Sequence, residues 1–409
     1  MSEPSLPPPP PPSLMEELIE EILLRLPPQE PASLFRAALV CKPWRRLVTS
    51  PRFQRRFREF HRRTPPMLGF LCDNHGDGDR CSFVRTTASS PLHATTSRWR
   101  PLDARHGRVL LREPTRNVLV VWDPITDDRQ VLPVLPRWAV TCTAAILCGA
   151  AACDHHDCHR GGSFLVVFVG TDPRNMFVCT YDSSDYFAAW SEPISLHHLN
   201  DCYIYAGYSP AVLLGNELYL GIPMTNTALK YDLELCEISW IQLPTLHYCD
   251  QRSVLTTTED GLGLISLLDG KLCMWLRMDN PEANNNAGWT QFKTIDFGSD
   301  PFFTSDAFVV GFADGLDIVF VTVNGVVCTV DLKTYMVKKV YNGRGIHAVF
   351  PYMRFFSPAR LEASSSHRRL CILMASLAQN DRSGDQPCPS VWFQELMPIN
   401  GKASSGADA

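Results

Sequence analysis

The sequence predicts a multidomain α plus all-β protein, with a small N-terminal bundle of helices followed by a β-propeller-like domain of about six four-stranded blades. Three observations predict this fold. Apolar residues recur at helical spacing from Leu14 to His61, and short β-type runs follow to about residue 395. Within the second region, a strand that ends in aspartate returns about every 50 residues, the period of kelch-like propeller blades. The alternative for this region is a β-sandwich or an irregular β domain.

The first predicted helix lies in LMEELIEEILLRLPP, where Leu14, Leu18 and Ile22 recur at i, i+4 and i+8. Four glutamates cover much of the remaining surface and crowd the N-terminal half, where the helix dipole favours acidic side chains. Pro27 and Pro28 end the helix, because proline removes a backbone donor and clashes with the preceding turn.

Three more short helices are expected before residue 61. The second covers about residues 31–40, the third begins with Pro43 in its first helical position, and the fourth begins at Pro51. The fourth helix places one stripe of aromatic side chains together, formed by Phe53, Phe57 and Phe60. So small a bundle has little core of its own, and we expect it to leave apolar surface that a partner covers.

Beyond the helices, the chain consists of short runs rich in β-branched and aromatic residues, bounded by Gly, Asp, Asn or Pro. MLGFLC, VLVVW, FLVVFVG and GVVCTVDL are examples. The expected boundaries are 1–13 for a disordered proline-rich leader, 14–61 for the helical domain, 62–66 for a linker, 67–397 for the β domain and 398–409 for a disordered tail.

Four aspartates mark the repeat of the β domain. Asp123, Asp182, Asp232 and Asp331 each end a strand, with separations of 59, 50 and 99 residues. The last interval spans two repeats, since CMWLRMDNPEANNNAGWTQFKTI supplies a similar hairpin with a longer turn at the skipped position. Aspartate at one equivalent position in every repeat indicates a turn residue that bonds nearby backbone N–H groups, in preference to a catalytic carboxylate.

The N-terminal segment LMEELIEEILLRLPPQEPASLFRAALVCKPWRRLVTSPRFQRRF resembles the F-box, the helical module that docks substrate receptors onto Skp1 in cullin–RING ubiquitin ligases. The usual Leu-Pro opening of the family is Leu14-Met15 here. The alternative for some positions, notably Ile22, Leu47 and Phe53, is a place in the core of the bundle. The resemblance implies that the Skp1-binding residues are Leu14, Leu18, Ile22, Leu23, Leu26, Pro27, Leu34, Val40, Cys41, Pro43, Trp44 and Leu47.

Several segments resemble the large plant F-box family, especially that of grasses. They are EEILLRLPP…LVCKPWRRL, MLGFL, DARHGRVLL, VWDPITD and VFPYMRFFSPARL. Members of that family carry a propeller-like F-box-associated β domain. The resemblance implies a non-catalytic substrate adaptor of a Skp1–cullin–F-box (SCF) ubiquitin ligase, with a Skp1-like protein, cullin and RING subunits and an unknown target protein as partners. No cofactor, nucleic acid or membrane is expected.

An alternative function is a β-propeller enzyme or sugar-binding protein whose helices only resemble an F-box. The sequence lacks the G-x-S-x-G, P-loop, kinase and H-E-x-x-H motifs. No catalytic residues are therefore assigned.

Composition indicates an ordinary globular protein, with 45% hydrophobic residues, 20% charged residues and a net charge of −5. The N-terminus lacks a signal-peptide pattern, so we expect the fifteen cysteines to be reduced, mostly buried, in the cytoplasm or nucleus. Nine basic residues and one acid lie between Lys42 and Arg63. We expect a solvated basic face there, or one that complements an acidic partner.

The segment CDHHDCH, residues 153–159, combines residue types that bind metals. Structural zinc sites favour two separated pairs of ligands, and this segment holds its ligands within seven residues between two β runs. We therefore assign no metal site and expect a loop, a candidate for target recognition.

Overall fold

The computed structural model describes residues 15–356, except 62–63, 75–79, 87–95, 98, 114, 150–161, 173–174, 198–209, 223–225, 245–252, 279–287, 298–306 and 344. Several sequence-based expectations therefore lie outside the described residues: the leader, Leu14, the part of the β domain after residue 356, and the tail. The CDHHDCH segment also lies outside them.

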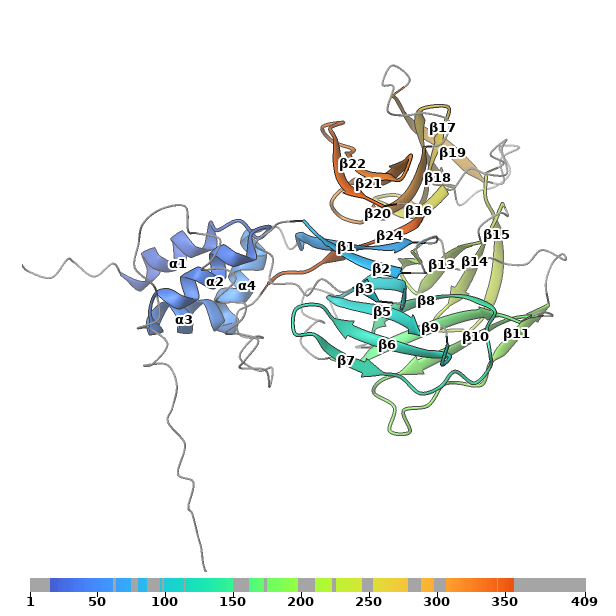
Figure 1. Cartoon of the computed structure of the whole chain (residues 1–409), viewed down its shortest axis with the longest axis horizontal. Helices are drawn as coiled ribbons and strands as arrows, with labels where there is room; N and C mark the ends of the chain where they lie inside the picture. The colour runs from blue at the N-terminus through green and yellow to red at the C-terminus, as the bar shows by residue number, and fades with distance from the viewer. Residues whose placement is uncertain are drawn as a thin grey trace, which may run out of the picture. The chain divides into compact units, whose positions relative to one another are not determined.

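Four helices form the N-terminal bundle (Figure 1). They are α1 (Glu16–Leu24), α2 (Pro31–Val40), α3 (Lys42–Thr49) and α4 (Pro51–Phe60). The order and positions of the helices are as the sequence predicts. Pro43, however, is the second residue of α3, because Cys41 is the extended residue that precedes this helix.

Local features mark where helices α1 and α4 begin. Glu16 and Glu17 lie in the first turn of α1, where acidic side chains complement the helix dipole. Before α4, the Ser50 hydroxyl accepts a hydrogen bond from the Phe53 backbone N–H at 3.2 Å. Phe53 and Phe57 of α4 are buried, whereas Phe60 is 49% exposed, so the expected aromatic stripe enters the core with only two of its three rings.

Six four-stranded antiparallel sheets follow, as the sequence predicts. From the innermost strand outward, the blades are as follows. Blade 1 is β24 (Ile346–Met353), β1 (Met67–Asn74), β2 (Arg80–Arg85), β3 (Thr96–Ser97); blade 2 is β4 (Arg100–Arg105), β5 (Arg108–Glu113), β6 (Val118–Asp123), β7 (Asp128–Val131). Blade 3 is β8 (Thr141–Cys148), β9 (Phe164–Thr171), β10 (Asn175–Asp182), β11 (Ile194–His197); blade 4 is β12 (Val212–Leu214), β13 (Glu217–Ile222), β14 (Thr227–Asp232), β15 (Ile238–Gln242). Blade 5 is β16 (Ser253–Thr258), β17 (Gly261–Leu268), β18 (Lys271–Arg277), β19 (Trp289–Asp296); blade 6 is β20 (Phe308–Ala313), β21 (Ile318–Val323), β22 (Val326–Asp331), β23 (Val337–Asn342).

The first blade joins the two ends of the propeller chain. Strand β24 pairs with β1 in antiparallel register, with Leu71 opposite Phe350, and Figure 1 shows the red-orange β24 beside the blue β1. The innermost strand of blade 1 thus comes from the far end of the propeller sequence. This closure covers strand edges that would otherwise be open to pairing with other chains.

Apolar clusters lie between neighbouring blades around the whole ring. Each cluster combines strands of two successive blades, such as Phe168 of blade 3 with Leu119 of blade 2, and Phe70 of blade 1 with Phe320 of blade 6. Between blades 1 and 2, the Phe83 ring packs against Trp122 with a centroid separation of 6.0 Å. The inner strands of each blade supply these clusters and so carry the apolar β-type runs of the sequence. Outer strands such as β7 are exposed and polar.

Candidate functional site

Helix α1 presents apolar side chains to solvent on one face. Leu18 is 47% exposed and Ile22 is 53% exposed, whereas Leu23 and Leu24 on the opposite side are each 2% exposed. The buried pair packs into the core of the bundle with residues of the other helices. The exposed leucine and isoleucine are therefore not needed for that core and are available for a partner.

The junction of α2 and α3 presents a second apolar surface. Val40 is 56% exposed, and Cys41 and Pro43 are also exposed. Trp44 and Leu47 are half-buried and pack against the edge of the core. Their inner faces support the bundle while part of each side chain reaches the surface.

Positive charge gathers on helices α3 and α4. Lys42, Arg46, Arg52 and Arg55 are exposed on α3 and α4. Arg56 is engaged within the bundle, where its guanidinium pairs with Glu20 and Glu21 of α1 at 2.7 and 2.8 Å. The hydrogen bonds that Arg56 donates to these carboxylates, the one to Glu20 first, raise the pKa of Arg56. The exposed basic side chains match the predicted basic face.

The core of the bundle is completed by a segment from beyond the propeller. Phe355, two residues after β24, is 7% exposed and belongs to the same cluster as the buried residues of α1–α4. Its ring meets Phe57 edge-on at a centroid distance of 6.3 Å, and Phe356 meets Phe35 at 6.4 Å. The helices therefore depend on residues nearly 300 positions further along the chain.

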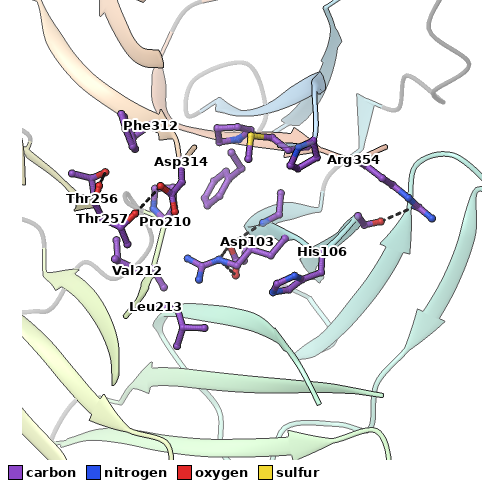
Figure 2. A pocket seen from close by; sticks show the side chains of 18 of the residues that line it. Asp103, His106, Pro210, Val212, Leu213, Thr256, Thr257, Phe312, Asp314 and Arg354 are labelled. Atoms are coloured by element: carbon purple, nitrogen blue, oxygen red, sulfur yellow. Dashed lines mark hydrogen bonds and ion pairs between the residues drawn. The ribbon is translucent and has the colours of Figure 1, made fainter. Parts of the chain in front are cut away.

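Within the propeller, a cavity of about 440 Å³ lies among the innermost strands (Figure 2). Five of these strands contribute to its wall: β4, β12, β16, β20 and β24. Figure 2 shows Phe312, Asp314, Thr257 and Val212 on one side of it and His106 on the other. Its volume falls in the range of about 300–1,000 Å³ typical of ligand pockets.

Two charged residues of β4 line the cavity. Asp103 is 1% exposed and accepts hydrogen bonds from the backbone N–H groups of Ala104 and Ile146, each at 2.9 Å. The Arg105 Nε atom lies 3.2 Å from the same carboxylate. Burial raises the pKa of the Asp103 carboxyl, and the charge of Arg105 acts against that rise.

The repeated aspartates lie in turns, as the sequence predicts. In Asp232, one carboxylate oxygen accepts the backbone N–H groups two and three residues ahead, each at 2.9 Å. Asp331 does the same at 2.8 and 2.9 Å, and these bonds lower the pKa of both carboxyls. Asp182 accepts the N–H of Ser184 at 2.8 Å. The carboxylates are thus engaged by the backbone of their own turns.

Asp123 has an additional partner. The Nη1 atom of Arg354, just after β24, lies 2.9 Å from both oxygens of Asp123 and 3.1 Å from the Gly107 carbonyl oxygen. Tyr352 donates its hydroxyl to the same carbonyl at 3.1 Å. Gly107 has φ +69°, and a Cβ added there would lie 2.6 Å from the Arg354 side chain, so this turn requires glycine. The end of the last strand is therefore bonded to blade 2.

Comparison with family models decides which family this architecture belongs to. Residues 12–56 match the F-box domain, and residues 101–359 match the family described as "F-box protein AT5G49610-like, beta-propeller". The chain belongs to this F-box family. Its architecture, an F-box joined to a β-propeller, is that of substrate-receptor proteins of SCF ligases.

The other comparisons add no argument about fold or function. No curated protein matches the chain. A functionally unknown protein from Desulfotomaculum acetoxidans DSM 771 is similar in structure, with 11% identity and a TM-score of 0.40, over 72% of this chain and 82% of that one. The extracellular domain of the putative one component system BT4673 from B. thetaiotaomicron has 14% identity and a TM-score of 0.34, over 68% of this chain and 30% of that one.

The predicted Skp1-binding residues of this F-box protein divide by exposure. Six are exposed, namely Leu18, Ile22, Pro27, Val40, Cys41 and Pro43; Leu26, Trp44 and Leu47 are half-buried; Leu23 and Leu34 are buried. Ile22 thus lies outside the core, while Phe53, 0% exposed, lies within it. The sequence-based set does not include Met15 and Leu39, which are 66% and 45% exposed. Met15 could have been included from its spacing of seven residues from Ile22.

Metal ligands do not gather in the part of the F-box protein that the structure describes. Within it, no group of three His, Cys, Asp or Glu side chains could hold a metal ion. No helix among the described residues is long and apolar enough to cross a membrane.

The described cysteines give a test of the fold. Six of these nine free thiols are buried, and only Cys41 and Cys236 are exposed. Burial raises the pKa of the Cys179 thiol to about 12, so at pH 8 almost none of it is the reactive thiolate. We expect Cys41 and Cys236 to be alkylated by iodoacetamide at pH 8, and Cys179 only after unfolding, as measured by peptide mass spectrometry. Labelling of Cys179 in the folded protein at a similar rate would contradict the placement of β10.

Proposed function

We propose that this F-box protein is the substrate-recognition subunit of an SCF ubiquitin ligase. Its F-box binds a Skp1-like adaptor, and through it cullin and RING subunits, while its propeller holds a target protein. The proposal depends on one observation: apolar side chains of α1 and of the α2–α3 junction are exposed on the surface of the small bundle.

Apolar burial gives this surface enough free energy for a stable complex. Burying one large apolar side chain contributes about 1.5–3 kcal/mol. Leu18, Ile22 and Val40 are all about half exposed and so retain much of that free energy for association. The exposed basic side chains of α3 and α4 favour an acidic partner, mainly by raising the association rate.

The protein's contribution to ubiquitination is proximity, since it holds the lysines of a target near a ubiquitin-charged enzyme. Bond formation is carried out by other subunits, and the chain itself acts as a non-catalytic adaptor. The cavity supports a non-catalytic role, because the carboxylates that line it are engaged by other groups of the protein. Of the carboxylates that line it, Asp103 is bonded to two backbone N–H groups and Arg105, and Asp314 accepts the Thr257 hydroxyl at 2.6 Å.

Substitution of the exposed F-box residues tests the proposal. We expect Ile22→Asp combined with Val40→Asp to weaken capture of a purified plant Skp1 protein at least about 100-fold, because two apolar contacts are lost and two charges are desolvated. The affinity is measured by calorimetry with the full chain. Since both side chains point to solvent, the melting temperature should hardly change.

Leu235→Asp is the matched control, because Leu235 is 66% exposed but lies on the propeller. It should leave the Skp1 affinity unchanged. The proposal fails if the wild-type chain does not bind Skp1 at micromolar concentration, or if the control and the double variant bind equally well.

We also propose that the protein works in the cytoplasm or nucleus. Its described cysteines are free thiols and mostly buried, which suits a reducing compartment. Fluorescent fusion of the full chain and cell fractionation measure the location, and accumulation in the secretory pathway would overturn the proposal.

A further inference from the structure

One wall of the propeller cavity is charged and is formed by strand β4. Asp103 and Arg105 are two residues apart on β4 and so project to the same side of the strand. A β-bulge between Pro101 and Asp103 sets their register against β5. Asp103 is held by two backbone N–H groups, one of them from β8 of the next blade. The carboxylate therefore has a fixed position.

This fixed carboxylate orients Arg105. Its contact with Asp103 is made through Nε, at 3.2 Å from both carboxylate oxygens. In the described part of the chain no other acceptor bonds the guanidinium, and its side chain is 20% exposed. The terminal nitrogens are thus left for a ligand. A guanidinium whose Nε is held in this way offers its two terminal N–H groups to a carboxylate in a preorganised fork.

The remaining wall limits the kind of ligand. Val212 and Phe312 supply apolar surface, while Thr257 donates to Asp314, an exposed carboxylate, at 2.6 Å. Figure 2 shows this hydrogen-bonded pair on the side of the cavity opposite His106. A second carboxylate in the wall disfavours a dianion such as phosphate. A single carboxylate next to an apolar side chain fits better, with Asp314 able to accept a peptide N–H.

The other arginine that lines the cavity, Arg354, is bonded within the protein. Arg354 is buried, bonds to Asp123 and the Gly107 carbonyl, and in Figure 2 points away from the centre of the cavity. The Nη2 atom of Arg354 has no hydrogen-bond partner but is buried, whereas the Arg105 side chain is 20% exposed. Arg105 is therefore the arginine of this wall whose remaining donors can reach a ligand.

We propose that Arg105 recognises a carboxylate of the target, so that the propeller binds an extended peptide segment whose carboxylate pairs with Arg105 and whose neighbouring apolar side chain enters the cavity. The carboxylate comes either from the C-terminus of the target or from an acidic side chain. This inference rests on the proposed function as a substrate receptor and names the chemical groups of the target that the receptor would bind.

Three pools of randomised synthetic octapeptides test it on the immobilised full chain. The first has a free C-terminal carboxylate and no Asp or Glu, the second an amidated C-terminus and one central Glu, and the third an amidated C-terminus and no acid. We expect peptides from the first or the second pool to be retained over the third, which identifies the source of the carboxylate. Peptides retained equally from all pools, or none retained at about 100 μM, would overturn the proposal.

Substitutions then assign the contact. For a selected peptide, Arg105→Gln should raise the Kd about 10- to 100-fold, because a charge-assisted hydrogen-bonded pair is lost. Arg105→Lys, which keeps the charge without the fork, should show a smaller loss. Arg116→Gln is the matched control, since Arg116 is 77% exposed on the β5–β6 connection, and should bind as the wild type does.

Melting temperatures check that all three variants are folded, and the Lys variant keeps the test valid if Arg105→Gln is unstable. Equal affinity of wild type and both Arg105 variants would refute the assignment. Skp1 binding is measured on the same samples. Loss of Skp1 binding with peptide binding intact would contradict the ligase function alone, whereas the reverse result would contradict the assignment of the cavity alone.

Discussion

Replacing Arg354 with methionine will lower the free energy of unfolding of the propeller by about 3–5 kcal/mol, the loss typical of a buried ion pair from which one partner is removed. The Arg354 side chain is 2% exposed and its Asp123 partner 14% exposed, so neither charge is well hydrated. The substitution leaves Asp123 without its cation and the Gly107 carbonyl without one of its donors. Urea unfolding followed by tryptophan fluorescence measures the loss.

Two aspartates provide the matched comparison. Asp123 and Asp331 occupy the same position in their blades and accept similar backbone bonds, but only Asp123 also pairs with Arg354. Asp123→Asn should therefore destabilise the propeller clearly more than Asp331→Asn. Equal effects of the two substitutions, or an unchanged unfolding curve for Arg354→Met, would show that this ion pair does not hold the ring closed.

The repeat of the propeller was predictable because its signal is local. Asp123, Asp232 and Asp331 each end the third strand of a blade, and each bonds backbone N–H groups within three residues. Such turns depend on neighbouring positions in the chain and so leave a period in the sequence. Helix α2 was predictable for the same reason, since Pro31 begins it and Pro43, at the start of the next helix, follows closely after its end.

Features that depend on distant parts of the chain were not predictable. Spacing alone places Ile22 and Leu23 on one broad apolar face, and the packing of the other helices decides that Leu23 is buried and Ile22 exposed. Arg354 gives no sign in the sequence that it pairs with a residue 231 positions earlier. Arg105 looks like any strand arginine until the buried carboxylate of Asp103 and the cavity are seen together.

The F-box will lose stability when a residue outside it is truncated. Phe355→Ala removes a buried ring from the cluster that holds α1–α4 together, and such changes cost about 3–5 kcal/mol in well-packed cores. Because the bundle is small, we expect amide hydrogen exchange in α1 and α4 to rise at least tenfold while the propeller strands stay protected. Skp1 capture should weaken in parallel, since the apolar face of α1 is presented only by the folded bundle.

Phe187→Ala is the control, because this phenylalanine is 82% exposed on the β10–β11 connection and should leave exchange and Skp1 capture unchanged. The contact partner of Phe355 gives a stricter test. Phe57→Ala should have an effect of similar size, and the double variant should lose less than the sum of the two, because the rings contact each other edge-on at 6.3 Å. Strict additivity, or unchanged exchange in α4 of Phe355→Ala, would mean that the F-box folds without the segment after β24. With the expected coupling, the proposed Skp1 binding would depend on a completed propeller chain, since Phe355, a member of the F-box core, follows the strand that closes the ring.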